Sequence, residues 1–152
     1  RIGNNFPTIV FNSITYLWVC DTIPFEHEFF IRVAQFFPYL KKLNGMNAES
    51  PSFNHVNFQR DIDHSYSIVE YPHLTSLSIM YVHIDYVEQF LLRTKTSLPR
   101  LTQLKVKYEK LRNVTENFTR DVTRFNCLQV KRIIFEETIV HLKEFYFYFP
   151  LL

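Results

Sequence analysis

The residues in this sequence best suited to chemistry lie in a short polar stretch. Asp61 and Asp63 flank Ile62, His64 follows directly, and His55 lies nearby. Carboxylates and imidazoles can bind a metal or move a proton, but only where a rigid scaffold fixes their geometry. This stretch has no fixed ligand spacing and no regular hydrophobic pattern. We therefore expect a solvated loop here, and an enzyme of unknown class using the 55–64 loop is the alternative.

Two other motifs fall short of known catalytic patterns. The Glu-His-Glu triplet at 26–28 resembles the zinc-binding helix of metalloproteases, but that motif needs a histidine at position 31, where the chain has Ile31. Cys127 and His141 could pair as nucleophile and base, yet nothing in the sequence orients them. With only two glycines, a phosphate-cradling loop is also excluded. We expect no enzyme activity, no metal site and no cofactor.

Composition indicates one globular domain and few special environments. The chain has 152 residues, of which 47% are hydrophobic and 21% charged. The net charge of +2 gives no strong field toward nucleic acid, and no apolar run approaches the roughly 18 residues of a membrane span. Two distant cysteines, and an N-terminus at Arg1 without a leader, favour part of a longer intracellular protein, in the cytoplasm or nucleus.

One pattern recurs along the chain. Segments 38–43, 72–77 and 99–104 share the frame Pro-x-Leu-x-x-Leu, and weaker copies without the proline lie at both ends. The first apolar anchors of the copies are Ile14, Leu40, Leu74, Leu101 and Val130. In each copy the last two apolar positions are two residues apart, which is the alternation of a strand with one buried face. Gly45 occupies the last position in the second copy.

The segments between the anchors have helical periodicity. Apolar residues recur at steps of three and four over 25–37, 85–98 and 111–125, with Asp85 as the expected N-cap of the second helix. Glu116 and Arg120 would pair on the wet side of the third helix. The pattern predicts a single α/β domain over 1–152: a leucine-rich-repeat-like solenoid of about five units. A parallel sheet would line its concave side and helices its convex side.

Two regions depart from this periodicity. We expect residues 47–69 to form an irregular loop, and the aromatic tail over 142–149 to form a terminal strand that covers the last unit. Alternating strands and helices also build other α/β arrangements, so a different topology is the alternative.

The repeated frame resembles the leucine-rich-repeat portion of F-box proteins, most clearly over residues 71–121. The resemblance implies a substrate-recruiting scaffold, joined to cullin-ligase subunits through an N-terminal F-box region that this chain lacks. The usual asparagine or cysteine after each strand is also missing, since Val82 and Glu109 occupy those places. The repeat scaffold is therefore better supported than the ubiquitin role.

The side chains that alternate with the buried ones would form the binding surface, with a protein as the partner. The predicted site residues are Tyr16, Trp18, Lys42, Asn44, Ser76, Ser78, Gln103, Lys105, Lys107 and Arg132. The same alternation places Cys20, Met46, Met80, Ile134 and Glu136 on this face. Exposed aromatics often carry binding energy, and the excess of cations would suit an acidic partner. The alternatives are an ordinary wet sheet face and a repeat fragment without independent function.

Overall fold

The computed structural model describes residues 8–47, 67–137 and 143–152, and its centre is a parallel sheet of five strands. The strands lie side by side in chain order: β1 (Tyr16–Cys20), β2 (Lys42–Asn47), β4 (Ser76–Val82), β6 (Gln103–Lys105) and β7 (Arg132–Ile134). A second, two-stranded sheet pairs β3 (Val69–Glu70) with β5 (Thr96–Ser97). The helices are α1 (His27–Phe36), α3 (Ile84–Leu91), α4 (Tyr108–Val114), α5 (Asp121–Arg124) and α6 (Lys143–Tyr148).

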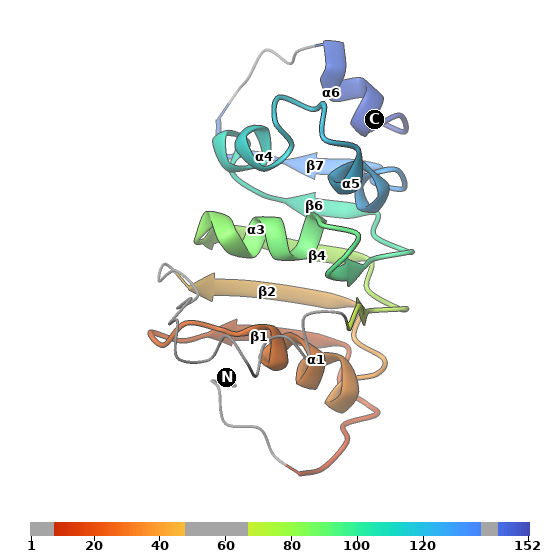
Figure 1. The fold of residues 1–152 in the computed structure, drawn as a ribbon. Coiled ribbons are helices and arrows are strands. Elements are labelled where there is room, and N and C mark those ends of the chain that lie inside the picture. Colours follow the sequence, from red (N-terminus) through yellow and green to blue (C-terminus); the bar gives the residue numbers. More distant parts are fainter. Residues whose placement is uncertain (1–7, 48–66, 138–142) are drawn as a thin grey trace.

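Helices α1, α3, α4 and α5 lie in front of the five-stranded sheet in Figure 1, so they cover one face, here called the helical side. This arrangement confirms the predicted α/β class and the parallel sheet. A short 3-10 turn, Phe125–Cys127, follows α5. No described helix has both the length and the apolar character needed to cross a lipid bilayer.

The strands form where the sequence alternates, because alternate side chains enter the core. The second apolar position of each repeat lies in one row across the sheet, in register from strand to strand: Leu17, Leu43, Leu77, Leu104 and Ile133. The first four of these are buried, and Ile133 is half-buried. The earlier anchors Leu40, Leu74, Leu101 and Val130 are at most 2% exposed. The predicted strand alternation is thus confirmed.

The same turn precedes four strands of the five-stranded sheet: β2, β4, β6 and β7. The N–H of each anchor, Leu40, Leu74, Leu101 and Val130, donates to the carbonyl three residues earlier, at 3.2 to 3.4 Å. In the first three turns, proline occupies the second position, where its fixed φ favours this geometry. Beyond the turn, two successive N–H groups donate to one carbonyl of the preceding unit. Those carbonyls belong to Thr15, Lys41, Thr75 and Thr102. The hydrogen bonds therefore repeat with the sequence frame.

The predicted helix over 111–125 is wrong, because a left-handed turn divides it into α4 and α5. Glu116, Asn117 and Phe118 have φ values of 53, 57 and 63°. The Thr115 hydroxyl donates to the Leu111 carbonyl and accepts from the Phe118 N–H, which holds the turn. The turn places the Phe118 ring in the core, 1% exposed.

Two polar expectations for the helices are also wrong. Arg120 does not pair with Glu116; its Nη1 lies 2.7 Å from Oε1 of Glu88 on α3. The N-cap of α3 is His83, whose Nδ1 accepts from the Asp85 N–H at 3.3 Å, so Asp85 lies within the first helical turn. The Asp85 carboxylate still interacts favourably with the positive N-terminal end of the helix dipole.

The expected terminal strand is instead helix α6. Phe145, Tyr148 and Phe149 are fully buried, and their spacing of three and one places them on one face of a helical turn. Tyr146 and Phe147 between them are more than half exposed. A strand would instead have placed Phe145, Phe147 and Phe149 on one face, so the exposed Phe147 agrees with the helix.

Strand β4 contains a bulge that changes which side chains point outward. Its register against β2 shifts between Asn44 and Met46, so that Met46 lies beside Tyr81. Met80, which the alternation places on the same exposed face as the predicted site residues, is 1% exposed, whereas Tyr81 is 51% exposed. An extra residue in one strand reverses the alternation beyond it, which is why the regular pattern is wrong here.

Gly45 lies where the repeat places a branched apolar residue. A Cβ built there is 3.3 Å from Cγ1 of Val82 and 4.0 Å from Cγ2 of Val19. It borders an interior space of about 10 Å³ whose apolar lining offers no polar partners to a water molecule. Gly45→Ala should therefore raise the free energy of unfolding by about 1 kcal/mol, through added burial and a less flexible unfolded chain. Urea denaturation measures this change. A lower urea midpoint for the variant would mean that the Val82 side chain cannot move away from the added methyl group.

Candidate binding surface

The predicted site residues point away from the helical side and form cross-strand rows, here called the open face. One row contains Tyr16, Lys42, Ser76, Gln103 and Arg132. The next contains Trp18, Asn44, Ser78, Lys105 and Ile134. Strands in parallel pairs lie about 4.8 Å apart, so each row is a line of adjacent side chains. The structure thus brings nine of the ten predicted residues together on two rows.

The N-terminal half of the open face carries large exposed apolar side chains, most of them aromatic. Tyr16 and Trp18 on edge strand β1 are 56% and 50% exposed, and Met46 on β2 is 38% exposed. Tyr81 extends this group across β4. Large side chains with few rotatable bonds lose little entropy on binding, so such groups commonly anchor protein partners.

The two rows also present three cationic side chains to solvent. Lys42, Lys105 and Arg132 are exposed, and across the described part of the chain none of them forms an ion pair. Ser76, Ser78 and Gln103 lie between them and are half-buried; the Gln103 amide donates weakly to the Ser76 hydroxyl at 3.4 Å. The open face therefore presents aromatic groups at one end and uncompensated positive charge beside them.

The tenth predicted residue, Lys107, belongs to a separate cluster. Its ammonium lies 3.9 Å from Oε2 of Glu136 and 5.6 Å from the ring centroid of Tyr81. The Tyr81 hydroxyl donates to Oε1 of Glu136 at 2.5 Å. That hydrogen bond, followed by the charge of Glu136, raises the pKa of Tyr81. Lys107 is thus already partly neutralised.

Glu136→Gln should lower the pKa of Tyr81 toward its ordinary value near 10. The sign follows from the native contact, which favours the neutral phenol. The stabilising contribution of this contact is present below the pKa of Tyr81 in the unfolded chain. It is lost as pH rises through the pKa of Tyr81 in the folded chain. Titration of the Tyr81 ring resonances measures the change. The exposed neighbour Glu137 offers a control, since Glu137→Gln should leave the titration unaltered; equal shifts in both variants would contradict the contact.

Sequence reasoning missed Tyr81. The signal was the pair Ile79 and Met80, two large apolar residues in succession followed by Tyr81 and Val82. Strict alternation cannot bury both members of such a pair on one face, so the run indicates an irregularity. It does not by itself say which residue turns outward.

The other chemical candidates lie in structural positions. His27 lies with Nε2 2.8 Å from the Ser67 carbonyl and Nδ1 2.8 Å from the Gln89 amide nitrogen, so it links α1, α3 and the segment that precedes β3. Cys127 is buried, its thiol donates to the Thr123 carbonyl, and burial raises its pKa to about 12. That thiol stays protonated at neutral pH. Cys20 and Cys127 are not joined by a disulfide bond.

The polar stretch with Asp61, Asp63 and His64 lies outside the described residues, as does His141. So does most of the expected irregular loop over 47–69. Within the part that the structure describes, no group of three or more His, Cys, Asp or Glu side chains is placed to hold a metal ion.

Comparison with known proteins adds no further constraint. No protein-family model, no curated protein and no solved structure matches this chain.

Proposed function

We propose that the chain is a leucine-rich-repeat-like solenoid that acts as an intracellular protein-interaction scaffold. The observation that carries the architecture is the repeated hydrogen-bond pattern. Four anchors close the same turn, and four carbonyls accept from the next unit in the same way. The strands of the five-stranded sheet also follow chain order. This order is what a solenoid requires, because each of its units contacts only the units before and after it.

The open face is the proposed binding surface. Its exposed aromatics supply anchors, while Lys42, Lys105 and Arg132 supply charge without internal partners among the described residues. A protein segment that carries both apolar and acidic side chains is complementary to such a surface. The resemblance to F-box proteins suggests that this segment belongs to a client of a cullin-based ubiquitin ligase, with the ligase subunits bound outside residues 1–152.

Affinity capture with charge-reversal variants tests the surface. Lys105→Glu combined with Arg132→Glu should remove the recurring partner captured by the native chain, because each change replaces attraction with repulsion. Arg100→Glu combined with Arg112→Glu is the matched control, since both arginines are exposed outside the open-face rows. Loss of the partner in the control and retention in the open-face variant would contradict the proposal. Recovery of cullin-ligase subunits with a longer form of the protein would separately test the ubiquitin role.

A further inference from the structure

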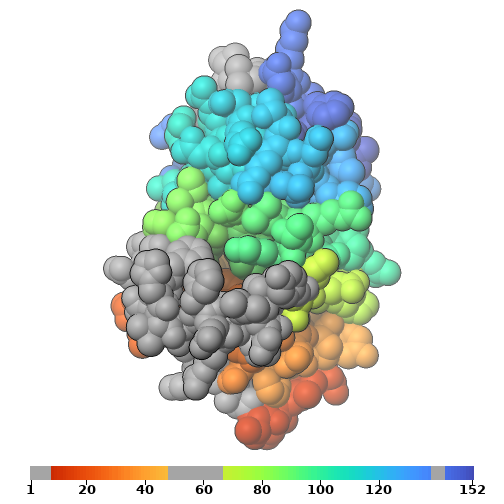
Figure 2. All heavy atoms as spheres, in the orientation of Figure 1, coloured from red at the N-terminus to blue at the C-terminus, as the bar shows by residue number. Residues whose placement is uncertain are grey.

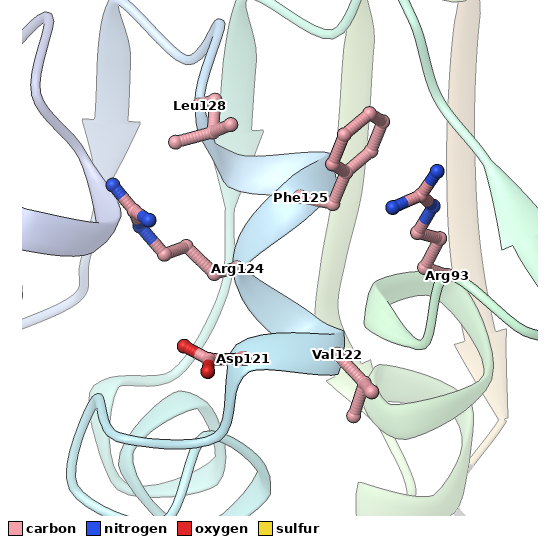
Figure 3. Close-up of a pocket in the computed structure, with 6 residues that line it drawn as sticks. All are labelled: Arg93, Asp121, Val122, Arg124, Phe125 and Leu128. Atoms are coloured by element: carbon pink, nitrogen blue, oxygen red, sulfur yellow. The ribbon is translucent and has the colours of Figure 1, made fainter.

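A second surface, on the helical side, combines an apolar floor with two arginines. It is a hollow of about 330 Å³ lined by Arg93, Asp121, Val122, Arg124, Phe125 and Leu128. Figure 3 shows Arg93 and Arg124 on opposite sides of the α5 segment, with Phe125 and Leu128 between them. Figure 2, which views the helical side, shows this part of the chain at the molecular surface. We call this surface the arginine hollow.

The floor of the arginine hollow exists because the predicted long helix is divided. A continuous helix would have directed Val122 and Phe125 into the core with Leu111. After the left-handed turn, both side chains are 43% exposed instead. The two exposed side chains give the arginine hollow its apolar floor.

Both guanidinium groups are held in place and remain uncompensated. Arg93 stacks 4.0 Å from the Phe125 ring centroid, and its backbone N–H donates to the Val122 carbonyl. Arg124 stacks 3.6 Å from the Phe147 ring, and its Nε donates to the Phe147 carbonyl. Neither guanidinium forms an ion pair within the described residues. Asp121 is the one acidic side chain of the lining, so positive charge predominates.

We propose that the arginine hollow binds an acidic peptide segment with an apolar side chain between its carboxylates. The apolar side chain would cover Val122, Phe125 and Leu128, and the carboxylates would reach Arg93 and Arg124. Guanidinium forks match carboxylates in geometry, and stacking on a ring reduces the entropy lost when they bind. A single-stranded nucleic acid fits less well, because Arg93 and Arg124 already occupy faces of the rings on which bases would stack.

Nuclear magnetic resonance can test the site with a defined probe. The probe is a short acetylated peptide of alternating glutamate and leucine, titrated into the ¹⁵N-labelled chain beside its glutamine analogue and an oligouridine of similar length. We expect the Nε–H signals of Arg93 and Arg124, and the amides of residues 121–128, to shift with the glutamate peptide. Arg93→Gln and Arg124→Gln should each weaken binding about threefold, as for exposed charge pairs. Arg100→Gln is the control and should leave binding unchanged.

Three results would overturn the proposal. The first is no shift of residues 121–128 at millimolar peptide, and the second is tighter binding of the oligouridine at these residues. The third is a set of shifts confined to Lys42, Lys105 and Arg132, which would place the acidic peptide on the open face and support the proposed function instead. Because the two surfaces use different reporter residues, failure of one proposal is distinguishable from failure of the other.

Discussion

Asn126→Ala is expected to lower the free energy of unfolding by about 4 kcal/mol. The Asn126 side chain is 2% exposed. Its amide joins the end of α3 to the segment that contains β5. Its Nδ2 donates to the carbonyls of Phe90, Leu91 and Thr96, and its Oδ1 accepts from the Leu98 N–H. Alanine would leave these backbone groups buried without partners, and each such group costs about 1–3 kcal/mol.

Urea denaturation followed by circular dichroism measures this loss. Asn113→Ala is the matched control, because Asn113 is exposed on α4 and a surface change there should alter stability by less than about 0.5 kcal/mol. Asn126→Asp should also destabilise, since a carboxylate would face three carbonyl oxygens. A native-like midpoint for Asn126→Ala would show that water replaces the amide, and the proposed role of Asn126 would be wrong.

Leu77→Ala should cost about 4 kcal/mol, near the upper end for buried leucines. Leu77 is fully buried at the centre of the apolar row, between Leu43 on β2 and Leu104 on β6. It also borders the small interior space beside Gly45. Truncation would enlarge an existing void, and the paired strands on both sides limit how far the core can collapse into it.

Two variants separate the cavity effect from other causes. Leu77→Met keeps the volume and should cost less than about 1.5 kcal/mol. Ser78→Ala changes the adjacent residue, which points toward the opposite face, and should be nearly neutral. If Leu77→Ala and Leu77→Met were equally destabilising, loss of volume would not account for the effect.

The strands were predictable because an apolar period of two, marked by leucine and valine, is typical of a half-buried strand and incompatible with a helical stripe. The row from Leu17 to Ile133 follows directly from the sequence frame. The turn at Glu116 to Phe118 was not predictable, because it uses left-handed backbone without glycine. A continuous apolar stripe cannot report such a turn, since Phe118 remains buried on either path.

The open face, the candidate binding surface, was predictable to the same extent as the strands. Nine candidate residues follow from alternation, whereas the exposure of Tyr81 depends on the bulge. The Lys107–Glu136 contact depends on the chain beyond β6 and β7. The arginine hollow had no sequence signal. Val122 and Phe125 look like core residues in a helical pattern, and only the division of that helix exposes them.

The bulge in β4 has a further consequence for how the chain can vary in length. Pairing between β4 and β6 covers only Ser76 to Ser78, which precedes the extra residue. A change of length after Ser78 therefore leaves the alignment of β6 and β7 untouched. We expect the segments after Lys105 and Ile134 to accept an inserted or deleted residue in the same way, because pairing of β4 with β6 and of β6 with β7 ends at the third position. Strands β1 and β2 pair over five positions, so their lengths are more closely fixed.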